Sequence, residues 1–188
     1  MRAWSRSINS SACRTDSMGG GSEEHVRLVA AKIHSQVNTW LRFTAEPVMA
    51  SYDDLLHLEE LLDRLAVTRH ELGPVHPLQV EEDEFEAPRS DQQVLRKHLA
   101  SRFPMLGFYN VPAKVTEDLG FGGMHVGDGI DDLLDITNEL EAVSWHLEKG
   151  RVGDACWNFG FSFDHHWRFH LRSLLWYLEQ RRMDGHLP

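Results

Sequence analysis

Cysteine, long apolar runs and catalytic motifs are all scarce in this chain of 188 residues. Only two cysteines are present, Cys13 and Cys156, and they lie too far apart to suggest a zinc ribbon or a disulfide framework. We therefore expect free thiols in a reducing, cytoplasmic compartment. The apolar runs are far shorter than the roughly 20 residues that a membrane-spanning helix needs, and no HExxH zinc motif occurs.

Basic residues are also in the minority. The chain has 19 lysines and arginines against 29 acids, and its formal net charge is −10. A general nucleic-acid binder needs a basic face, and anionic membranes attract basic segments. We therefore predict no nucleic-acid partner and no membrane partner. The hydrophobic fraction of 41% and the charged fraction of 26% are ordinary for a soluble globular protein of one domain.

Apolar residues recur at steps of three and four along most of the chain, which is typical of helices. The sequence predicts an all-α antiparallel bundle of four main helices, at about residues 23–45, 51–71, 128–149 and 152–182. A shorter helix is expected at about 91–102. The glycine- and proline-rich stretch 104–129 is expected to form an ordered irregular connection or a small hairpin. Residues 1–22 are predicted to be a disordered tail or linker, which leaves 23–188 as the single domain.

The last two helices carry the most informative polar residues. His166 and His170 stand four apart, so both can lie on one face of the C-terminal helix. Asp132, Asp135 and Glu139 follow steps of three and four on the preceding helix. Because the turn between the two helices is short, they should be antiparallel neighbours. We expect Asp135 to face His166, with Asp132 or Glu139 one turn away. These five residues form a candidate site for a divalent metal.

A structural role explains the same residues without a metal. Asp128 is a candidate N-cap, which would place Asp131 and Asp132 in the first helical turn, where acids favour the positive end of the helix dipole. His166 and His170 would then each be satisfied by a carboxylate or a carbonyl. Structural networks of this kind are common, so the structural role is the first expectation.

The aromatic residues of the second half suggest a family. The resemblance rests on Trp157, Phe161, Phe163, the His166-Trp167 pair and His170, on Asp131 to Ile136, and on Phe108-Tyr109. These features resemble a bacterial family known as domain of unknown function 5063, although Arg168 stands where that family often has a small residue. The resemblance covers about half of the chain. It implies a compact helical domain and no established activity.

Two functions remain open from the sequence. The favoured one is a non-enzymatic module that binds a protein partner, a second copy of the chain or a small ligand. Tyr109, Phe163 and Trp167 are the candidate lining of a ligand pocket, and His125 is a further residue of interest in the glycine-rich stretch. The alternative is a metal-dependent hydrolase that uses the histidine and carboxylate cluster to hold a divalent ion.

Overall fold

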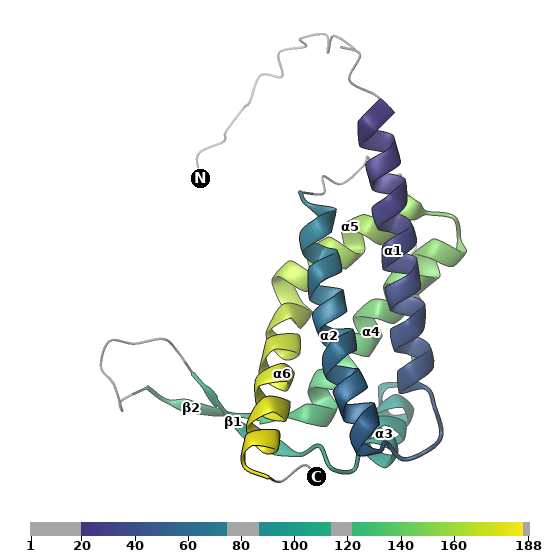
Figure 1. Ribbon diagram of the computed structural model, residues 1–188. Coiled ribbons are helices and arrows are strands. Elements are labelled where there is room, and N and C mark those ends of the chain that lie inside the picture. Colours follow the sequence, from purple (N-terminus) through teal and green to yellow (C-terminus); the bar gives the residue numbers. More distant parts are fainter. Residues whose placement is uncertain (1–19, 75–86, 114–121, 186–188) are drawn as a thin grey trace, which may run out of the picture.

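A computed structural model describes residues 20–74, 87–113 and 122–185, and most of these residues are helical (Figure 1). The predicted all-α bundle is confirmed. Residues 1–19 of the predicted tail lie outside the described residues. The elements are α1 (Gly20–Thr44), α2 (Tyr52–Leu72), α3 (Gln92–Arg102), β1 (Phe108–Pro112), β2 (Met124–Asp128), α4 (Gly129–Glu148), α5 (Val152–Ser162), the π-turn η1 (Phe163–Trp167) and α6 (Arg168–Met183). No described helix combines the length and the apolar character needed to cross a membrane.

Helix α4 is the centre of the bundle and packs against α1, α3, α5 and α6. Its apolar face is fully buried at Leu133, Ile136, Leu140 and Val143. The indole Nε1 of the buried Trp40 in α1 donates a hydrogen bond of 3.1 Å to Thr137 Oγ1 in α4. This bond satisfies the polar edge of a large aromatic side chain, which would otherwise cost free energy on burial.

Local sequence signals set where the helices begin. Ser51 caps α2 in a capping box with Asp54. Asp128 caps α4 as predicted, and its side chain accepts a hydrogen bond of 3.0 Å from the backbone of Ile130. The turn between α4 and α5 contains Gly150 at φ +72°, in the left-handed region that favours glycine. This tight turn makes α4 and α5 antiparallel neighbours.

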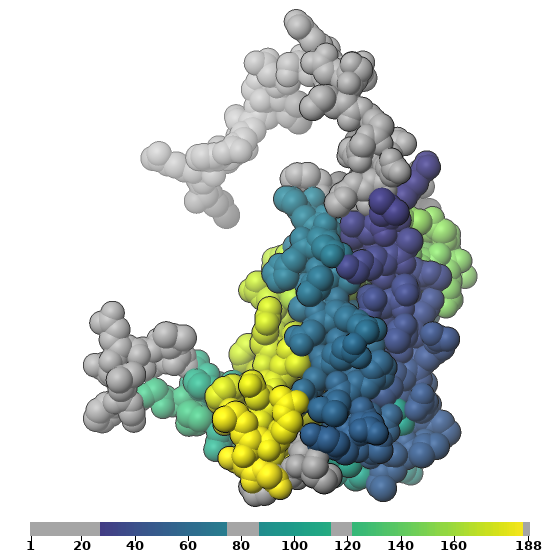
Figure 2. Space-filling view, in the orientation of Figure 1, coloured from purple at the N-terminus to yellow at the C-terminus, as the bar shows by residue number. Residues whose placement is uncertain are grey.

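The stretch 104–129 contains a small antiparallel hairpin formed by β1 and β2. It stands out from the side of the bundle next to α6 (Figures 1 and 2). Tyr109 lies opposite Gly127, and a Cβ atom at Gly127 would be only 2.5 Å from the tyrosine ring. The glycine therefore lets the Tyr109 ring lie flat across β2, where it stacks on Tyr177 of α6 at 4.6 Å between ring centroids.

The C-terminal stretch 152–182 was expected to be one regular helix, and the structure differs in its middle. The π-turn at Phe163–Trp167 is closed by a hydrogen bond from the Arg168 N–H to the Phe163 carbonyl, and the chain bends there between α5 and α6 (Figure 1). Phe159, Phe163, Trp167 and Leu171 are spaced by four, and all are buried. In a regular α-helix each step of four overshoots a full turn by about 40°. The wider π-turn absorbs this drift and keeps the four side chains in the core.

Candidate metal centre

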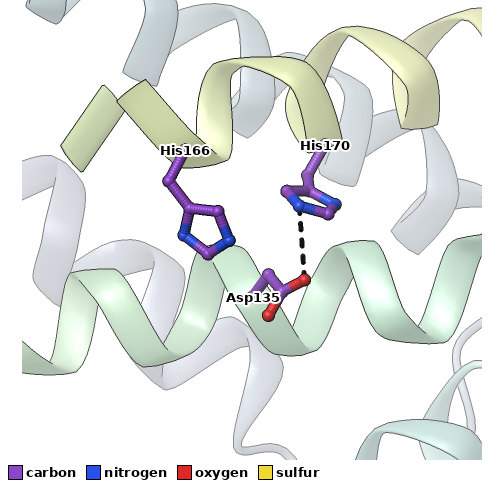
Figure 3. A group of neighbouring side chains, drawn as sticks. All are labelled: Asp135, His166 and His170. Carbon is purple, nitrogen blue, oxygen red and sulfur yellow. Dashed lines mark ion pairs between the residues drawn. The ribbon is translucent and has the colours of Figure 1, made fainter. Parts of the chain in front are cut away.

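The five residues predicted for the metal site meet between α4 and the C-terminal helix. Asp132, Asp135 and Glu139 lie along one side of α4. His166 belongs to the π-turn and His170 to the first turn of α6. Figure 3 shows both imidazole rings directed at Asp135 on the facing helix. Single π-turns within α-helices occur frequently at functional sites, and this one contributes a histidine to the cluster.

His170 is held between two carboxylates. Its Nδ1 lies 2.9 Å from Asp132 Oδ1, and its Nε2 lies 3.3 Å from Asp135 Oδ2. Burial by itself lowers the pKa of His170, but the hydrogen bond to Asp132 and the charges of Asp135 and Asp132 outweigh it and raise the pKa above its ordinary value. This shift favours the protonated ring, which donates from both nitrogens, more than in a free imidazole. Burial raises the pKa of Asp135, against the opposing charge of His170.

Asp132 is almost fully buried, with 5% of its surface exposed. Its second carboxylate oxygen accepts a hydrogen bond from the hydroxyl of Tyr109 in β1. Burial and this bond to the Asp132 carboxylate raise the pKa of Tyr109, so its hydroxyl keeps its proton. A buried carboxylate requires such compensation. The hairpin thus fixes the orientation of Asp132, and Asp132 fixes the ring of His170.

His166 has its own carboxylate partner. Its Nδ1 lies 2.9 Å from Glu139 Oε1, and 45% of its side chain is exposed. The short turn between the two helices predicted that Asp135 would face His166. In the structure Asp135 is a near neighbour of His166, whereas the hydrogen bond goes to Glu139, one helical turn further along α4.

Asp135, His166 and His170 can each direct one ligand atom to a common point, and these atoms lie within 4.8 Å of one another. Ligand atoms around a tetrahedral zinc are about 3.3 Å apart, from bond lengths of about 2.0–2.1 Å. Small side-chain rotations would therefore close the site around an ion. Two histidines and one carboxylate are the donor set of zinc and non-haem iron sites with open positions. Glu139 and Asp132 hold Nδ1 of the two rings, as outer carboxylates do in many metal sites.

The remaining predicted residues lie elsewhere. Phe163 and Trp167 are fully buried in the core, and the Trp167 indole donates to Ser162 Oγ at 2.9 Å. Neither belongs to the lining of the polar cavity that adjoins the cluster. His125 is exposed on β2, opposite Val111. Tyr109 joins the cluster through its hydrogen bond to Asp132.

A polar cavity of about 390 Å³ adjoins the cluster. Asp135, Glu139 and His166 line it on the side of the cluster, and Asn138 and Asn158 are further lining residues. The sequence did not point to the two asparagines, because they lie on different helices and belong to no motif. Asn158 interrupts an aromatic run in α5, whereas Asn138 lies beside the acidic residues of α4 and does not stand out in the sequence.

Comparisons with known proteins add no further identification. No family model matches the chain, and neither a curated protein nor a solved structure matches it. The resemblance to domain of unknown function 5063 therefore stays a prediction.

Proposed function

We propose that Asp135, His166 and His170 bind a divalent transition-metal ion, and that the protein is a metal-dependent hydrolase. The observation that carries this proposal is the pairing of each histidine with its own carboxylate. Glu139 and Asp132 engage Nδ1 of His166 and His170, which orients the rings so that the other nitrogen is the one available to an ion beside Asp135. Zinc, manganese and ferrous iron all accept this donor set.

A bound ion would polarise a substrate carbonyl or phosphoryl group and lower the pKa of a bound water. The protein side chains supply orientation and access. Tyr109 and Asp132 keep the His170 ring in place from the buried side. His166 is half exposed and lines the polar cavity together with Asp135, so a substrate in that cavity would lie beside two of the residues that would hold the ion.

Metal content and hydrolytic activity test this proposal together. We expect near-stoichiometric metal in the tag-free protein, or uptake of Zn²⁺, Co²⁺ or Mn²⁺ by the metal-free protein at about one ion per chain. The double variant His166→Ala, His170→Ala should lose this uptake, together with any metal-dependent cleavage of p-nitrophenyl esters and phosphate esters. His165→Ala is the matched control, because His165 lies in the same turn but bonds to the Phe161 carbonyl at 2.8 Å. Equal metal uptake by the double variant and the control would refute the site.

Protein binding is the second candidate function, and the exposed apolar face of the hairpin favours it. Phe108, Met124 and Val126 are 75%, 58% and 73% exposed. They share one face of the hairpin, since Val126 pairs with Asn110 and Met124 with Pro112, while Tyr109 faces the bundle. Exposed apolar groups gathered in this way are typical of interaction surfaces. Light scattering tests self-association: a monomer at all concentrations would leave only a different protein partner for this face.

A further inference from the structure

A second pocket lies between α1, α3 and α4, apart from the histidine and carboxylate cluster. Its volume of about 530 Å³ is in the range of small-molecule sites. Its apolar lining comes from Leu41 and Ala45 of α1 and from Val94 and Leu95 of α3. None of its lining residues belongs to the polar cavity or to the cluster. The pocket is therefore a separate site, whose ligand can be inferred without reference to a metal.

Part of the apolar lining is in contact with solvent. The Val94 side chain is 66% exposed. Leu41 and Leu95 are only partly buried, although both pack against the core. Removing apolar surface from water is favourable. An apolar group placed between α1 and α3 would therefore be bound favourably.

The charged groups of this lining are of one sign. Glu141 of α4 and Asp91 at the start of α3 supply two carboxylates, and none of the described residues that line the pocket is a lysine or an arginine. The polar cavity beside the cluster differs, since Arg89 and Arg151 contribute to its lining. The second pocket therefore attracts a cationic group and repels an anionic one.

Glu141 is the carboxylate that a ligand can use. It is partly buried, and it forms no hydrogen bond or ion pair with any other residue that the structure describes. Asp91 is already engaged as the N-cap of α3, where its Oδ1 accepts hydrogen bonds of 2.9 Å from Gln93 and 3.2 Å from Val94. An ammonium group beside Glu141 would form a charge-assisted hydrogen bond, which is stronger than one between neutral groups.

The other polar residues in the wall of the pocket have partners within the protein. Nε2 of His98 lies 2.9 Å from the carbonyl oxygen of Thr44. Since a carbonyl oxygen only accepts, this nitrogen carries a proton and donates it, which holds the imidazole in place. Thr137 Oγ1 accepts its hydrogen bond from Trp40. These bonds leave Glu141 as the charged group of the pocket that can be paired by a ligand.

We infer that this pocket binds a small amphipathic amine, in which an ammonium group is attached to an apolar alkyl or aromatic body. The ammonium group pairs with Glu141, and the apolar body lies against Leu41, Val94 and Leu95. The charge of Asp91 adds to the attraction. This inference goes beyond the proposed function and holds whether or not the cluster binds a metal.

Calorimetric titration of the full chain tests the inference with five probes: hexylamine, phenethylamine, methylamine, hexanol and hexanoate. EDTA is included, so that no amine can bind through a metal. Hexylamine or phenethylamine should bind at one molecule per chain and more tightly than the other three probes. The tighter of these two amines identifies the apolar body as alkyl or aromatic.

Two kinds of titration result would overturn the inference. If neither amine with an apolar body binds, the pocket is not an amine site. If methylamine, hexanol or hexanoate binds as tightly as the better amine, the pocket does not require both a charge and an apolar body.

Two variants locate the bound amine. Glu141→Gln should weaken binding of the better amine about tenfold, because the ammonium group loses its charged partner. Val94→Lys should weaken it at least as much, because it places a tethered ammonium group at the pocket. Val94 is exposed and lysine is a good helix former, so the melting temperature of this variant should stay close to that of the parent protein.

Glu148→Gln is the matched control. It makes the same change in net charge on the same helix, at an exposed position outside the lining of the pocket. Its affinity for the amine should equal that of the parent protein. Unchanged affinity in Glu141→Gln or in Val94→Lys, or an equal loss in Glu148→Gln, would overturn the inference.

Discussion

Asp132 and Asp135 lie one turn apart on α4 and both contact His170, yet we expect opposite consequences from neutralising them. Asp132 is buried and accepts hydrogen bonds from Tyr109 and His170. Removing one partner of a buried ion pair costs about 3–5 kcal/mol. In a domain of this size each kcal/mol corresponds to about 2–4 °C in melting temperature. Asp132→Asn should therefore lower the melting temperature by about 6–20 °C.

Asp135→Asn should behave differently in the metal-free protein. Burial raises the pKa of Asp135 in spite of the attraction of His170. A carboxyl group whose folded-state pKa is raised destabilises the fold as pH rises from the unfolded pKa, near 3.9, through the folded pKa. Above the folded pKa this destabilisation is fully present, and the neutral amide removes it. We expect a melting temperature no more than about 2 °C below that of the parent protein, or above it, together with loss of metal binding.

Calorimetry in EDTA at pH 7 gives the melting temperatures, and the visible absorption of added Co²⁺ reports metal binding. Asp131→Asn is the control, since Asp131 is exposed and pairs at the surface with Arg96 at 2.9 Å, where such pairs contribute about 0–1 kcal/mol. If Asp135→Asn destabilises the metal-free protein as strongly as Asp132→Asn, the cluster is a structural network, and the reasoning for a metal site is refuted.

Three further predictions concern the same cluster. Glu139→Gln should weaken metal binding about 10–100-fold while keeping one ion per chain. Competition with a chelator measures the metal affinity. An unchanged affinity would contradict the role of Glu139 in orienting the His166 ring from outside the ligand set. Metal binding displaces the proton of His170 Nε2, so the metal affinity should fall about tenfold per pH unit below the raised pKa of His170 and level off above it. Metal titrations between pH 5 and 8.5 test this prediction. A pH-independent metal affinity would exclude His170 as a ligand. Tyr109→Phe leaves a buried carboxylate oxygen of Asp132 without its donor, at a cost of about 1–3 kcal/mol, so chemical denaturation should show a lower free energy of unfolding. In Gly127→Ala the added methyl would collide with the Tyr109 ring, and a similar loss there would support the same contact, whereas full stability of both variants would contradict it.

The pattern of the sequence determined which segments are helical and which two helices carry the site. Apolar steps of three and four marked the bundle, and Asp128 marked the start of α4, because capping depends on residues next to each other in the chain. The short turn at Gly150 implied that the acidic face of α4 would lie against the histidines. The steps of three and four in this stretch predicted one regular helix, and the π-turn within it was not predicted.

Tertiary packing decided the pairing of individual side chains. Whether His166 bonds to Asp135 or to Glu139 depends on the rotation and offset between two helices, which the π-turn and the packing of the core set together. The bond from Tyr109 to Asp132 requires the hairpin to fold back onto α6. The cavity with Asn138 and Asn158 exists only because α4 and α5 face each other at that point, and no local sequence pattern encodes a contact between residues on separate helices.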